Sequence, residues 1–544
     1  MSILYFPSLD PLRQLLLPSL PIIVVDPILI LLRNSSRPKL SLPTAPLPAP
    51  GSGSRAPNFG MPTDLSSPRL PRKAKIVGTI YIIGAGPSGL LLALLLSRHS
   101  STFGPGPDGG GGGIGIPVTI LEAAHALDPR PRAAHYGTPC IPDLIRAGII
   151  DKIRDRGFVL STMTWRKPGT FEELGGFESG GLRGVSMDGL EGVPEGVWGL
   201  PRGIGMNGRK GGEGEGEDLR THCLVLQDLC KVMLEECLER GVQVCWGSRV
   251  VGVGHTGLGD TDGEKEEKGA WVEVEVTGED GEVKERKRVG GEGCIVVGAD
   301  GANSAVRKGL FGDEFPGFTW DRTIIATNTY YDFDKFGWSD ANFIIDPDNF
   351  FMAARISPAT PSHPSLYRIT YAEVPNLTHA QYLARQPFKF QSILPGFPTP
   401  DQYQLLTLSP YKMHQRCAPS FRVGRVLLVA DAAHLCNPWG GLGITGGFVD
   451  VGGLYDCLAG IWDDRADEEE MLELYSEKRM EKWKTVIDPV SQENFRRVSG
   501  QLEMEKDEFL GALRKVKKGD EKGVGKVLLG MMGVRYDFTV HYRR

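Results

Sequence analysis

The glycines Gly84, Gly86 and Gly89 form a G-x-G-x-x-G pattern that could bind a pyrophosphate. The pattern stands between a β-rich apolar run, 79–83, and an apolar stretch with helical spacing, 88–98. The first glycine permits a tight turn, the second lets backbone N–H groups approach phosphate oxygens, and the third allows the helix to pack closely on the strand. Because the positive end of the helix dipole also attracts an anion, this segment predicts a site for the phosphates of a nucleotide cofactor.

Glu122 ends the next predicted strand, 118–122, where a carboxylate can accept hydrogen bonds from the hydroxyls of a ribose. It follows Gly84 by more than the usual spacing of about 20 residues, because a glycine-rich insertion, 103–117, precedes this strand. A solvated carboxylate at a strand end is the alternative interpretation. Together these residues predict an ADP-binding βαβ unit with a parallel sheet, but they do not separate NAD from FAD.

Two further aspartates follow apolar runs much later in the chain. Asp300 precedes a segment that opens a helix, so it could also cap that helix. Asp431 ends the run 426–430 and is followed by Pro438 and several glycines. Such a segment offers a carboxylate and bare backbone to a group that must approach closely. A flavin is such a group, because its ribityl chain needs a hydrogen-bond acceptor and its flat ring needs backbone near its polar edge.

Together these motifs resemble the three sequence fingerprints of single-component FAD-dependent aromatic hydroxylases, the para-hydroxybenzoate hydroxylase-like flavoprotein monooxygenases. The resemblance runs over most of residues 77–465, and three ordered motifs are far more specific than any one of them. The residues that carry it are Gly84, Gly86, Gly89, Glu122, Asp300, Gly301, Gly424, Arg425, Asp431, Ala432, Ala433, His434, Pro438, Gly441, Leu442 and Gly443. It implies an α/β fold with a Rossmann-like FAD-binding domain and parallel sheet, a mainly antiparallel-sheet substrate domain, and a helical C-terminal tail.

The resemblance also implies roles for individual residues. Asp300 would take part in binding both the cofactor and the nicotinamide substrate. Asp431 would hold the ribityl hydroxyls of FAD. The loop 438–443, which includes Pro438, Gly441, Leu442 and Gly443, would lie with its backbone against the isoalloxazine ring.

Two more cofactor contacts and two departures follow from the same comparison. Arg132, with Arg130 as a near competitor, matches an arginine that contacts FAD, and Gln227 matches a residue at a helix start near the pyrophosphate. Ala430 stands where the third motif usually has glycine, and Thr445 replaces a frequent asparagine. We expect the methyl group of Ala430 to be tolerated if its φ is negative, and Thr445 keeps a hydroxyl donor.

The reaction that the resemblance implies is hydroxylation of a phenolic or other aromatic small molecule. NADPH or NADH reduces FAD, O₂ adds at the flavin C4a, and the distal oxygen of the hydroperoxide is transferred to the ring. A base that ionises the phenol would help. His135, Tyr136 and His414 are candidates by type and placement only, so no catalytic side chain is assigned. Aromatic residues of the middle segment suit either a planar substrate or a core, namely Phe318, Trp320, Tyr330, Tyr331, Phe350 and Phe351.

Other functions compete with this one. A flavin-dependent epoxidase or halogenase would use the same cofactor, although the W-x-W-x-I-P pattern of many flavin-dependent halogenases is absent from the sequence. An NAD-dependent dehydrogenase would explain the first motif but would leave Asp431 and its loop without a purpose. A flavin-binding protein without turnover would retain all three motifs.

The order of these patterns predicts a division of the chain into regions. They are a disordered or extension segment, 1–75; a discontinuous FAD-binding domain, 76–168, 219–255, 290–320 and 412–465; a Gly-rich insertion, 169–218; a substrate-binding sheet domain, 321–411; and a helical C-terminal region, 466–544. The C-terminal region could cover the active site or form the face of a homodimer.

Composition limits the classes of partner. The net charge of −6 gives no case for a nucleic-acid partner, and the nine cysteines show no metal-ligand spacing. Residues 14–32 are apolar enough for a membrane span, but Asp26 and three prolines argue against one. We expect residues 1–60 to be an extension upstream of Met61, and the protein to be a cytoplasmic enzyme whose partners are a small aromatic substrate and O₂.

Overall fold

The computed structural model describes residues 78–99, 115–129, 135–178, 220–256, 268–517 and 530–543. The predicted extension, the apolar stretch 14–32 and most of the glycine-rich insertions therefore lie outside the described residues. Within the described ranges, no helix combines the length and the apolar character needed to cross a membrane.

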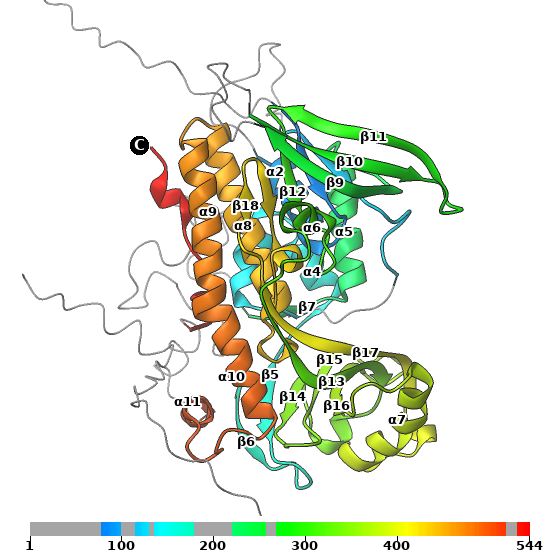
Figure 1. The fold of residues 1–544 in the computed structure, drawn as a ribbon. Coiled ribbons are helices and arrows are strands. Elements are labelled where there is room, and N and C mark those ends of the chain that lie inside the picture. Colours follow the sequence, from blue (N-terminus) through cyan, green and yellow to red (C-terminus); the bar gives the residue numbers. More distant parts are fainter. Residues whose placement is uncertain are drawn as a thin grey trace, which may run out of the picture. The chain divides into compact units, whose positions relative to one another are not determined.

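A six-stranded sheet forms the centre of the predicted nucleotide-binding region (Figure 1). Its strands, in spatial order, are β18 (Arg422–Val423), β19 (Val426–Leu428), β12 (Ile295–Gly298), β1 (Ile80–Ile83), β2 (Val118–Leu121) and β8 (Gln243–Cys245). All neighbours pair in parallel except β18 and β19, which pair antiparallel. The short apolar runs of the sequence thus form the buried parallel sheet that its βαβ pattern predicts.

The helices next to this sheet share one hydrophobic core with it. Helix α2 (Pro87–Ser97) is apolar on all sides and has nine buried residues, because it packs against strands as well as against other helices. The other helices of this region are α3 (Ile141–Arg146), α4 (Ile150–Arg156), α5 (Leu226–Glu239), α6 (Ala305–Phe311) and α8 (Leu442–Trp462). Both α5 and α8 contact α2. Helix α2 begins shortly after the end of β1, and α8 contacts the turn that follows β19.

Two small sheets accompany this core. One is an antiparallel sheet of β9 (Ser248–Thr256), β10 (Gly269–Thr277) and β11 (Val283–Glu292). The other joins β3 (His135–Tyr136), β7 (His222–Cys223) and β4 (Phe158–Val159).

The second large sheet has eight strands and is mainly antiparallel. Its order is β20 (His434–Leu435), β17 (Gln404–Cys417), β13 (Gly317–Tyr330), β16 (Leu366–Glu373), β15 (Phe351–Ser357), β14 (Ala341–Ile344), β5 (Thr162–Arg166) and β6 (Glu173–Glu178). Helix α7 (His379–Ile393) packs on one face. The predicted range of this sheet domain, 321–411, leaves out β5 and β6, which join the sheet through a parallel pairing of β5 with β14 that no local pattern encodes. Its status as a separate domain stays a prediction.

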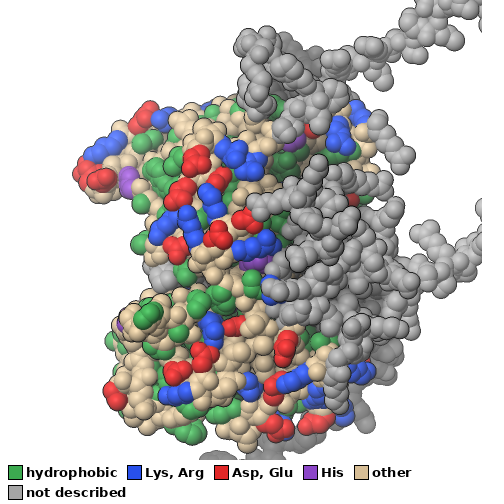
Figure 2. Space-filling model, turned by 180° about the vertical axis from the view of Figure 1, so that it is seen from behind, with side chains coloured by type: hydrophobic (Ala, Val, Ile, Leu, Met, Phe, Trp, Pro, Cys, Tyr) green, Lys and Arg blue, Asp and Glu red, His purple; other side chains and the backbone are tan. Residues whose placement is uncertain are grey.

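The C-terminal part of the chain is helical, as predicted. It contains α9 (Glu468–Lys482), α10 (Asp488–Val498) and α11 (Glu508–Lys517), and a π-helical turn, Trp483–Ile487, joins α9 to α10. The predicted fold class, with a parallel sheet, an antiparallel sheet and a helical tail, is confirmed. On the face drawn in Figure 2, acidic and basic side chains of the described residues are interspersed, without a field of one sign.

Candidate functional site

The three sequence motifs meet at one edge of the parallel sheet. Strands β2, β1, β12 and β19 are neighbours and run in the same direction, so their carboxyl ends lie at the same edge. Backbone hydrogen bonds continue the pairing past the strand ends, from Gly84 N to the Leu121 carbonyl at 2.8 Å and from Val429 N to the Gly298 carbonyl at 3.0 Å. Ligands of open α/β sheets bind at this edge.

The glycines of the first motif differ in what surrounds them. Gly84 has φ of +105°, and a Cβ there would lie 2.7 Å from the Ala299 carbonyl oxygen. A Cβ at Gly89 would lie 2.0 Å from the Gly84 carbonyl oxygen. These two glycines therefore permit the turn and the helix packing, as predicted from the pattern. A Cβ at Gly86 would meet no atom within 4 Å, so this glycine leaves open space beside the backbone at the start of α2.

The carboxylate of Glu122 is fixed against the first motif. Its Oε2 accepts a hydrogen bond from Ala85 N at 2.6 Å, and its Oε1 accepts one from Ala124 N at 2.8 Å. The half-buried side chain thus bridges the ends of β1 and β2. This is the position in which a carboxylate can face the ribose of a nucleotide whose phosphates lie at α2.

Asp300 caps helix α6 with both of its carboxylate oxygens. Oδ1 accepts from the Ser304 hydroxyl, and Oδ2 accepts from the backbone N–H groups of Ala305 and Val306 at 2.6 and 3.2 Å. Burial raises the pKa of Asp300, although these hydrogen bonds oppose the rise. The predicted capping role is therefore present, and a cofactor role for Asp300 stays a prediction.

Arg307 links the second motif to the third, a contact that sequence reasoning missed. Its guanidinium donates to the Ala432 carbonyl at 2.9 Å and to the Ala302 carbonyl at 2.7 Å. The side chain is buried. An arginine inside a motif was visible in the sequence, but its partner lies too far along the chain to be read from spacing.

Ala430 adopts the left-handed conformation, with φ of +53°. The condition under which its methyl group was expected to be tolerated, a negative φ, is therefore not met, because the turn after β19 keeps the conformation for which glycine is preferred. The Ala430 N–H donates to Asp450 Oδ2 at 3.0 Å. Asp431, the next residue, is exposed at the end of this strand.

A buried ionic network that the sequence analysis did not find holds this turn. Asp450 on α8 accepts from His434 Nε2 at 2.8 Å and from Arg479 Nε at 2.7 Å, in addition to the bond from Ala430. All three ionisable side chains of this network are buried. Burial alone would raise the pKa of Asp450, but Arg479 and His434 lower it below its ordinary value. The carboxylate is therefore ionised when it positions the turn.

The third motif also lies against the first. A Cβ at Gly447 on α8 would stand 2.6 Å from the Ala430 Cβ and 3.4 Å from the Ser88 Oγ. Ser88 is the second residue after Gly86, and Ala430 directly precedes Asp431. The structure thus brings the glycine motif and the neighbourhood of Asp431 together.

The loop 438–443 exposes bare backbone at the start of α8. Gly441 has φ of +63° and is the N-terminal cap residue of this 21-residue helix, which has no acidic residue in its first turn. A Cβ at Gly441 or at Gly443 would meet no atom within 4 Å, and Leu442 between them is half-buried. The loop therefore offers free space and the positive end of a helix dipole. Thr445 Oγ1 donates to the Gly441 carbonyl at 2.8 Å, so this hydroxyl is bound within the helix.

Buried polar groups fix the start of the same loop. The side-chain amide of Asn437 donates to Gln415 Oε1 at 3.1 Å and to the Ser491 carbonyl at 3.0 Å, and its oxygen accepts from Trp439 N at 3.1 Å. The Trp439 ring packs edge-to-face on Phe350, with 5.2 Å between ring centroids. Pro438 begins this short helical turn, and its neighbours Asn437 and Trp439 fix the backbone on either side of it.

Of two further predicted cofactor contacts, the structure describes one. Arg132, like its competitor Arg130, lies outside the described residues. Gln227 lies in the first turn of α5. With its amide oriented to match its neighbours, the nitrogen donates to the Pro129 carbonyl at 2.9 Å and the oxygen accepts from Lys231 at 3.3 Å. Gln227 therefore contacts the segment that leads to Arg130.

The three candidate bases have different surroundings. Tyr136 donates to the Leu224 carbonyl at 3.0 Å and is fully buried, which raises its pKa, so it is part of the core. His414 Nδ1 lies 2.9 Å from Thr319 Oγ1. His135 Nε2 lies 2.8 Å from the Arg355 carbonyl oxygen, which can only accept, so Nε2 carries the proton. Burial lowers the pKa of His135, which keeps the ring neutral and leaves Nδ1 as an acceptor.

Most aromatic residues of the middle segment belong to cores. Tyr331 and Phe351 pack in the cluster beneath α7, and Phe350 packs on the opposite face of the sheet. Trp320 lies 4.5 Å from Phe495 between ring centroids. Phe318 is 42% exposed, and Tyr330 stacks on His363 at 4.7 Å.

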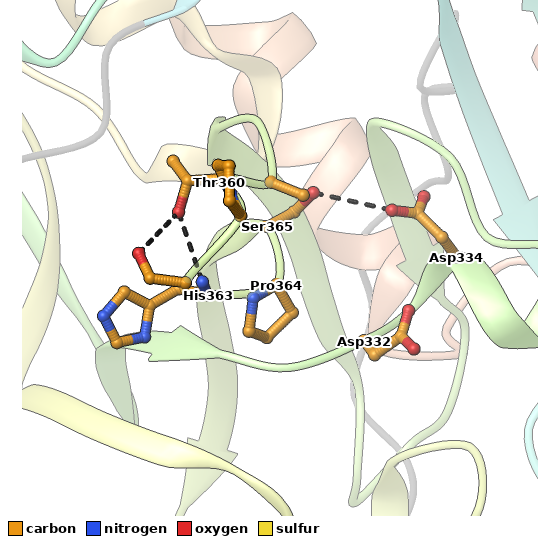
Figure 3. A pocket seen from close by; sticks show the side chains of 9 residues that line it. Asp332, Asp334, Thr360, His363, Pro364 and Ser365 are labelled. Atoms are coloured by element: carbon orange, nitrogen blue, oxygen red, sulfur yellow. Dashed lines mark hydrogen bonds between the residues drawn. The ribbon is translucent and has the colours of Figure 1, made fainter.

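A cavity of about 390 Å³ lies elsewhere, at the end of β13 (Figure 3). Asp332 and Asp334 stand on one side, and the loop 359–365 forms the other. Ser365 donates to Asp334 Oδ2 at 3.5 Å. No residue of the three motifs is among its lining residues, so it is not part of the cofactor site.

The chain is similar to known flavoenzymes over most of its length. The FAD binding domain family model matches residues 78–489. Para-nitrophenol 4-monooxygenase from Pseudomonas sp. (strain WBC-3) is 30% identical over 420 residues, which cover 76% of this chain and 86% of that protein. 6-Hydroxy-3-succinoylpyridine 3-monooxygenase HspB from Pseudomonas putida (strain DSM 28022 / S16) is 30% identical over 441 residues, covering 81% of this chain and 94% of that protein.

A solved structure agrees with these relatives. The crystal structure of p-nitrophenol 4-monooxygenase PnpA from Pseudomonas putida DLL-E4 superimposes with a TM-score of 0.65 at 27% identity, covering 84% of this chain and 99% of that one. The matched region contains all three motifs and the strands that bring them together. We conclude that the chain belongs to the family of FAD-dependent aromatic hydroxylases, as its motifs predicted.

Proposed function

We propose that this enzyme uses NADPH or NADH and O₂ to hydroxylate a phenolic small molecule. One observation carries the proposal: three strand ends from distant parts of a monooxygenase-like chain meet at one sheet edge, where Gly86, Gly441 and Gly443 leave space beside their backbone. Both para-nitrophenol and 6-hydroxy-3-succinoylpyridine, named for the relatives, are hydroxylated aromatic rings.

The residues of the site fit FAD. The backbone at Gly86 and the start of α2 would face its pyrophosphate, Glu122 its ribose, and Asp431 its ribityl chain. The loop 438–443 would lie along the isoalloxazine ring, where the start of α8 favours negative charge. FAD supplies the redox and oxygen chemistry, while the protein binds, orients and shields the reactants from water.

The test is a phenol-dependent turnover assay on the purified, FAD-loaded enzyme. We expect para-nitrophenol or a related phenol to accelerate oxidation of NADPH or NADH. Oxygen transfer to a ring carbon that carries hydrogen gives a product heavier by one oxygen atom, whereas transfer to the nitro-bearing carbon of para-nitrophenol expels the nitro group as nitrite. Oxidation that no phenol stimulates would support a flavoprotein without this turnover. A brominated or chlorinated product in the presence of halide, or an epoxide, would support the alternative flavin enzymes.

A matched pair of variants tests the placement of the cofactor. Asp431→Asn should weaken FAD binding by about tenfold or more, because a charge-assisted hydrogen bond contributes roughly 1.5–3 kcal/mol. Glu505→Gln, at an exposed position of the C-terminal region, serves as the control and should bind FAD as the wild type does. Flavin fluorescence titration measures both constants. Equal affinity of the two variants would argue against a ribityl contact at Asp431.

Two finer points accompany the proposal. We propose a homodimer, which light scattering of the purified protein tests by its mass. We also propose a cytoplasmic location, which cell fractionation tests.

A further inference from the structure

Residues 530–543 form a segment that packs against helices α8 and α9, and we call it the C-terminal strap. Figure 1 shows it in red beside α9. Its only named element is the short helix η9 (Phe538–His541). Five of its side chains are nevertheless buried, namely Met532, Val534, Arg535, Asp537 and Phe538. A segment with so little regular structure needs specific contacts to offset the entropy lost when it is fixed in this place.

Two glycines of α8 leave room for aromatic rings of the strap. A Cβ at Gly453 would stand 2.7 Å from Phe538 Cε2, and a Cβ at Gly460 would stand 2.3 Å from Tyr542 Cε1. The two glycines are about two helical turns apart, so they lie on the same side of α8. The Tyr542 hydroxyl donates to the carbonyl of Asp456, which lies between them in the sequence. The strap therefore packs directly on the backbone of α8.

A buried ion pair fixes the first half of the strap. Arg535 Nη1 donates to Asp143 Oδ2 and to the Pro139 carbonyl, both at 2.6 Å. Asp143 on α3 is 0% exposed and Arg535 is 3% exposed. Separation of two buried charges leaves each without its partner, which is costly, so this pair holds the strap in place.

The strap also reaches the start of α8. A Cβ at Gly137 would lie 3.6 Å from Thr445 Oγ1 and 4.0 Å from Met531 Cε. Thr445 in turn donates to the Gly441 carbonyl. The strap thus lies close to the helix start that follows the loop 438–443.

Arg479 on α9 connects the strap with the turn after β19. Its Nη1 donates to the Val534 carbonyl of the strap, and its Nε donates to Asp450 Oδ1, both at 2.7 Å. The other oxygen of Asp450 accepts from Ala430 N at 3.0 Å. One buried guanidinium therefore binds both the strap and the carboxylate that holds this turn.

Tyr475 makes a second connection from the same helix. Its hydroxyl donates to the carbonyl of Leu428, the last residue of β19, at 2.9 Å. Its ring lies 6.2 Å from the Phe538 ring between centroids. Because Tyr475 and Arg479 are four residues apart, they lie on one face of α9, and this face contacts both the strap and the end of β19.

We propose that the C-terminal strap positions the turn that carries Ala430 and Asp431, so that docking of the strap and binding of FAD strengthen each other. Tyr475 and Arg479 are the positioning residues. Without the strap, the buried Nη1 of Arg479 loses its acceptor, and the fork of the guanidinium is less firmly directed at Asp450. The inference rests on the proposed placement of FAD at this sheet edge. It goes beyond that placement, because none of the three motifs includes the strap.

A matched pair of variants tests the effect of the strap on FAD. Phe538→Ala removes the ring that packs on Gly453 and leaves the residues of the three motifs unchanged. Phe390→Ala is the control, because this equally buried ring belongs to the cluster under α7. In a fluorescence titration of the full-length apoprotein, Phe538→Ala should bind FAD about fivefold to a hundredfold more weakly, which is the usual range of coupling between two sites. Phe390→Ala should bind FAD as the wild type does.

Two further variants test whether the effect passes through α9. Phe538→Leu refills most of the space of the ring and should retain most of the FAD affinity. Arg479→Lys keeps a positive charge beside Asp450 but loses the planar fork that reaches two acceptors, so it should weaken FAD binding. Since both changes act on one connected network, Phe538→Ala should weaken FAD binding less in Arg479→Lys than in the wild type.

Hydrogen exchange tests the same coupling in the wild-type chain. Because coupling between two sites is reciprocal, saturating FAD should slow amide exchange in residues 530–543 by at least the factor by which Phe538→Ala weakens FAD. The exposed strand β11 serves as the internal control. Its amides should exchange at the same rate with and without FAD.

The outcomes separate this inference from the proposed placement of FAD. If Asp431→Asn weakens FAD while Phe538→Ala binds it as the wild type does, the inference is overturned and the placement stands. If Phe538→Ala and Phe390→Ala weaken FAD equally, the cause is a general loss of stability, and the inference is again overturned. If Phe538→Ala does not fold, the exchange experiment decides: slower exchange of the strap with FAD supports the inference, and unchanged exchange overturns it. If the wild type binds no FAD, both proposals are overturned.

Discussion

The contact between α8 and the third motif depends on two small residues, and it yields a quantitative prediction. The missing side chain of Gly447 faces the methyl group of Ala430: an added Cβ would stand 2.6 Å from that methyl carbon and 3.3 Å from the Ala430 Cα. Carbon atoms do not approach to 2.6 Å, so Gly447→Ala must push the turn after β19 away from the helix. Changing Ala430 to glycine at the same time removes the 2.6 Å contact and leaves only the 3.3 Å approach to the Cα of residue 430.

The magnitudes follow from the geometry. Gly447→Ala improves helix propensity by about 1 kcal/mol, but overpacking costs roughly 1–3 kcal/mol. Ala430→Gly relieves a left-handed alanine, worth about 1–2 kcal/mol, and loses a buried methyl group worth about 0.8 kcal/mol. The glycine also gives the unfolded chain more conformational freedom, which lowers the free energy of unfolding by about 0.4–1 kcal/mol. We therefore expect each single substitution to change the free energy of unfolding only modestly. The double variant should be about 1–3 kcal/mol more stable than the sum of the two single effects predicts.

Urea denaturation of the wild type, both single variants and the double variant measures this coupling in the free energy of unfolding. The FAD concentration must be equal throughout, because a bound cofactor adds stability. Gly511→Ala in α11 provides the control, since a Cβ there meets no atom within 4 Å and should not couple to Ala430. A coupling below about 0.5 kcal/mol, the usual limit of additivity, would refute the packing argument.

The remaining predictions concern the glycine motif and the buried network. Gly89→Ala should prevent folding into soluble protein, because its Cβ would lie 2.0 Å from a backbone oxygen. Gly86→Ala should leave the melting temperature of the apoprotein unchanged and weaken the binding of FAD at least about tenfold, as measured by fluorescence titration. The lowered pKa of Asp450 means that its carboxylate stabilises the fold above its unfolded value of 3.8, and that this stability is lost as pH falls through the lower folded value. Asp450→Asn should therefore lose roughly 3–5 kcal/mol near neutral pH and show a flatter acid limb when the urea midpoint is followed from about pH 7 to 3. A variant whose acid limb is as steep as that of the wild type would contradict the assignment to Asp450.

The ends of the buried strands could be predicted from local sequence patterns. A glycine turn between a strand and a helix has a distinctive spacing, and a carboxylate directly after an apolar run marks the end of a buried strand. The sequence could therefore indicate Gly84, Glu122 and Asp431 without coordinates. That their strands are neighbours followed from the resemblance to a family, since pairing in parallel sheets links residues far apart in the chain.

Contacts between distant residues account for what was missed. Nothing around Asp450 or Arg479 shows that both reach the turn at Ala430, because the helices that carry them are placed by tertiary packing. The left-handed φ of Ala430 was hidden by its residue type, which seldom adopts that conformation. The strands β5 and β6 join the large sheet through the pairing of β5 with β14, which a short apolar run does not predict.

The link from Arg307 to Ala432 has a consequence for how the holoenzyme is made. A nascent chain that ends before β19 already contains β1, β2 and β12, yet it lacks the carbonyl to which Arg307 donates and the whole of α8. Since chains emerge from the ribosome with the N-terminal part first, the sheet edge at which the three motifs meet is completed only late in synthesis. If FAD binds at this edge as proposed, its loading follows the synthesis of β19 and α8.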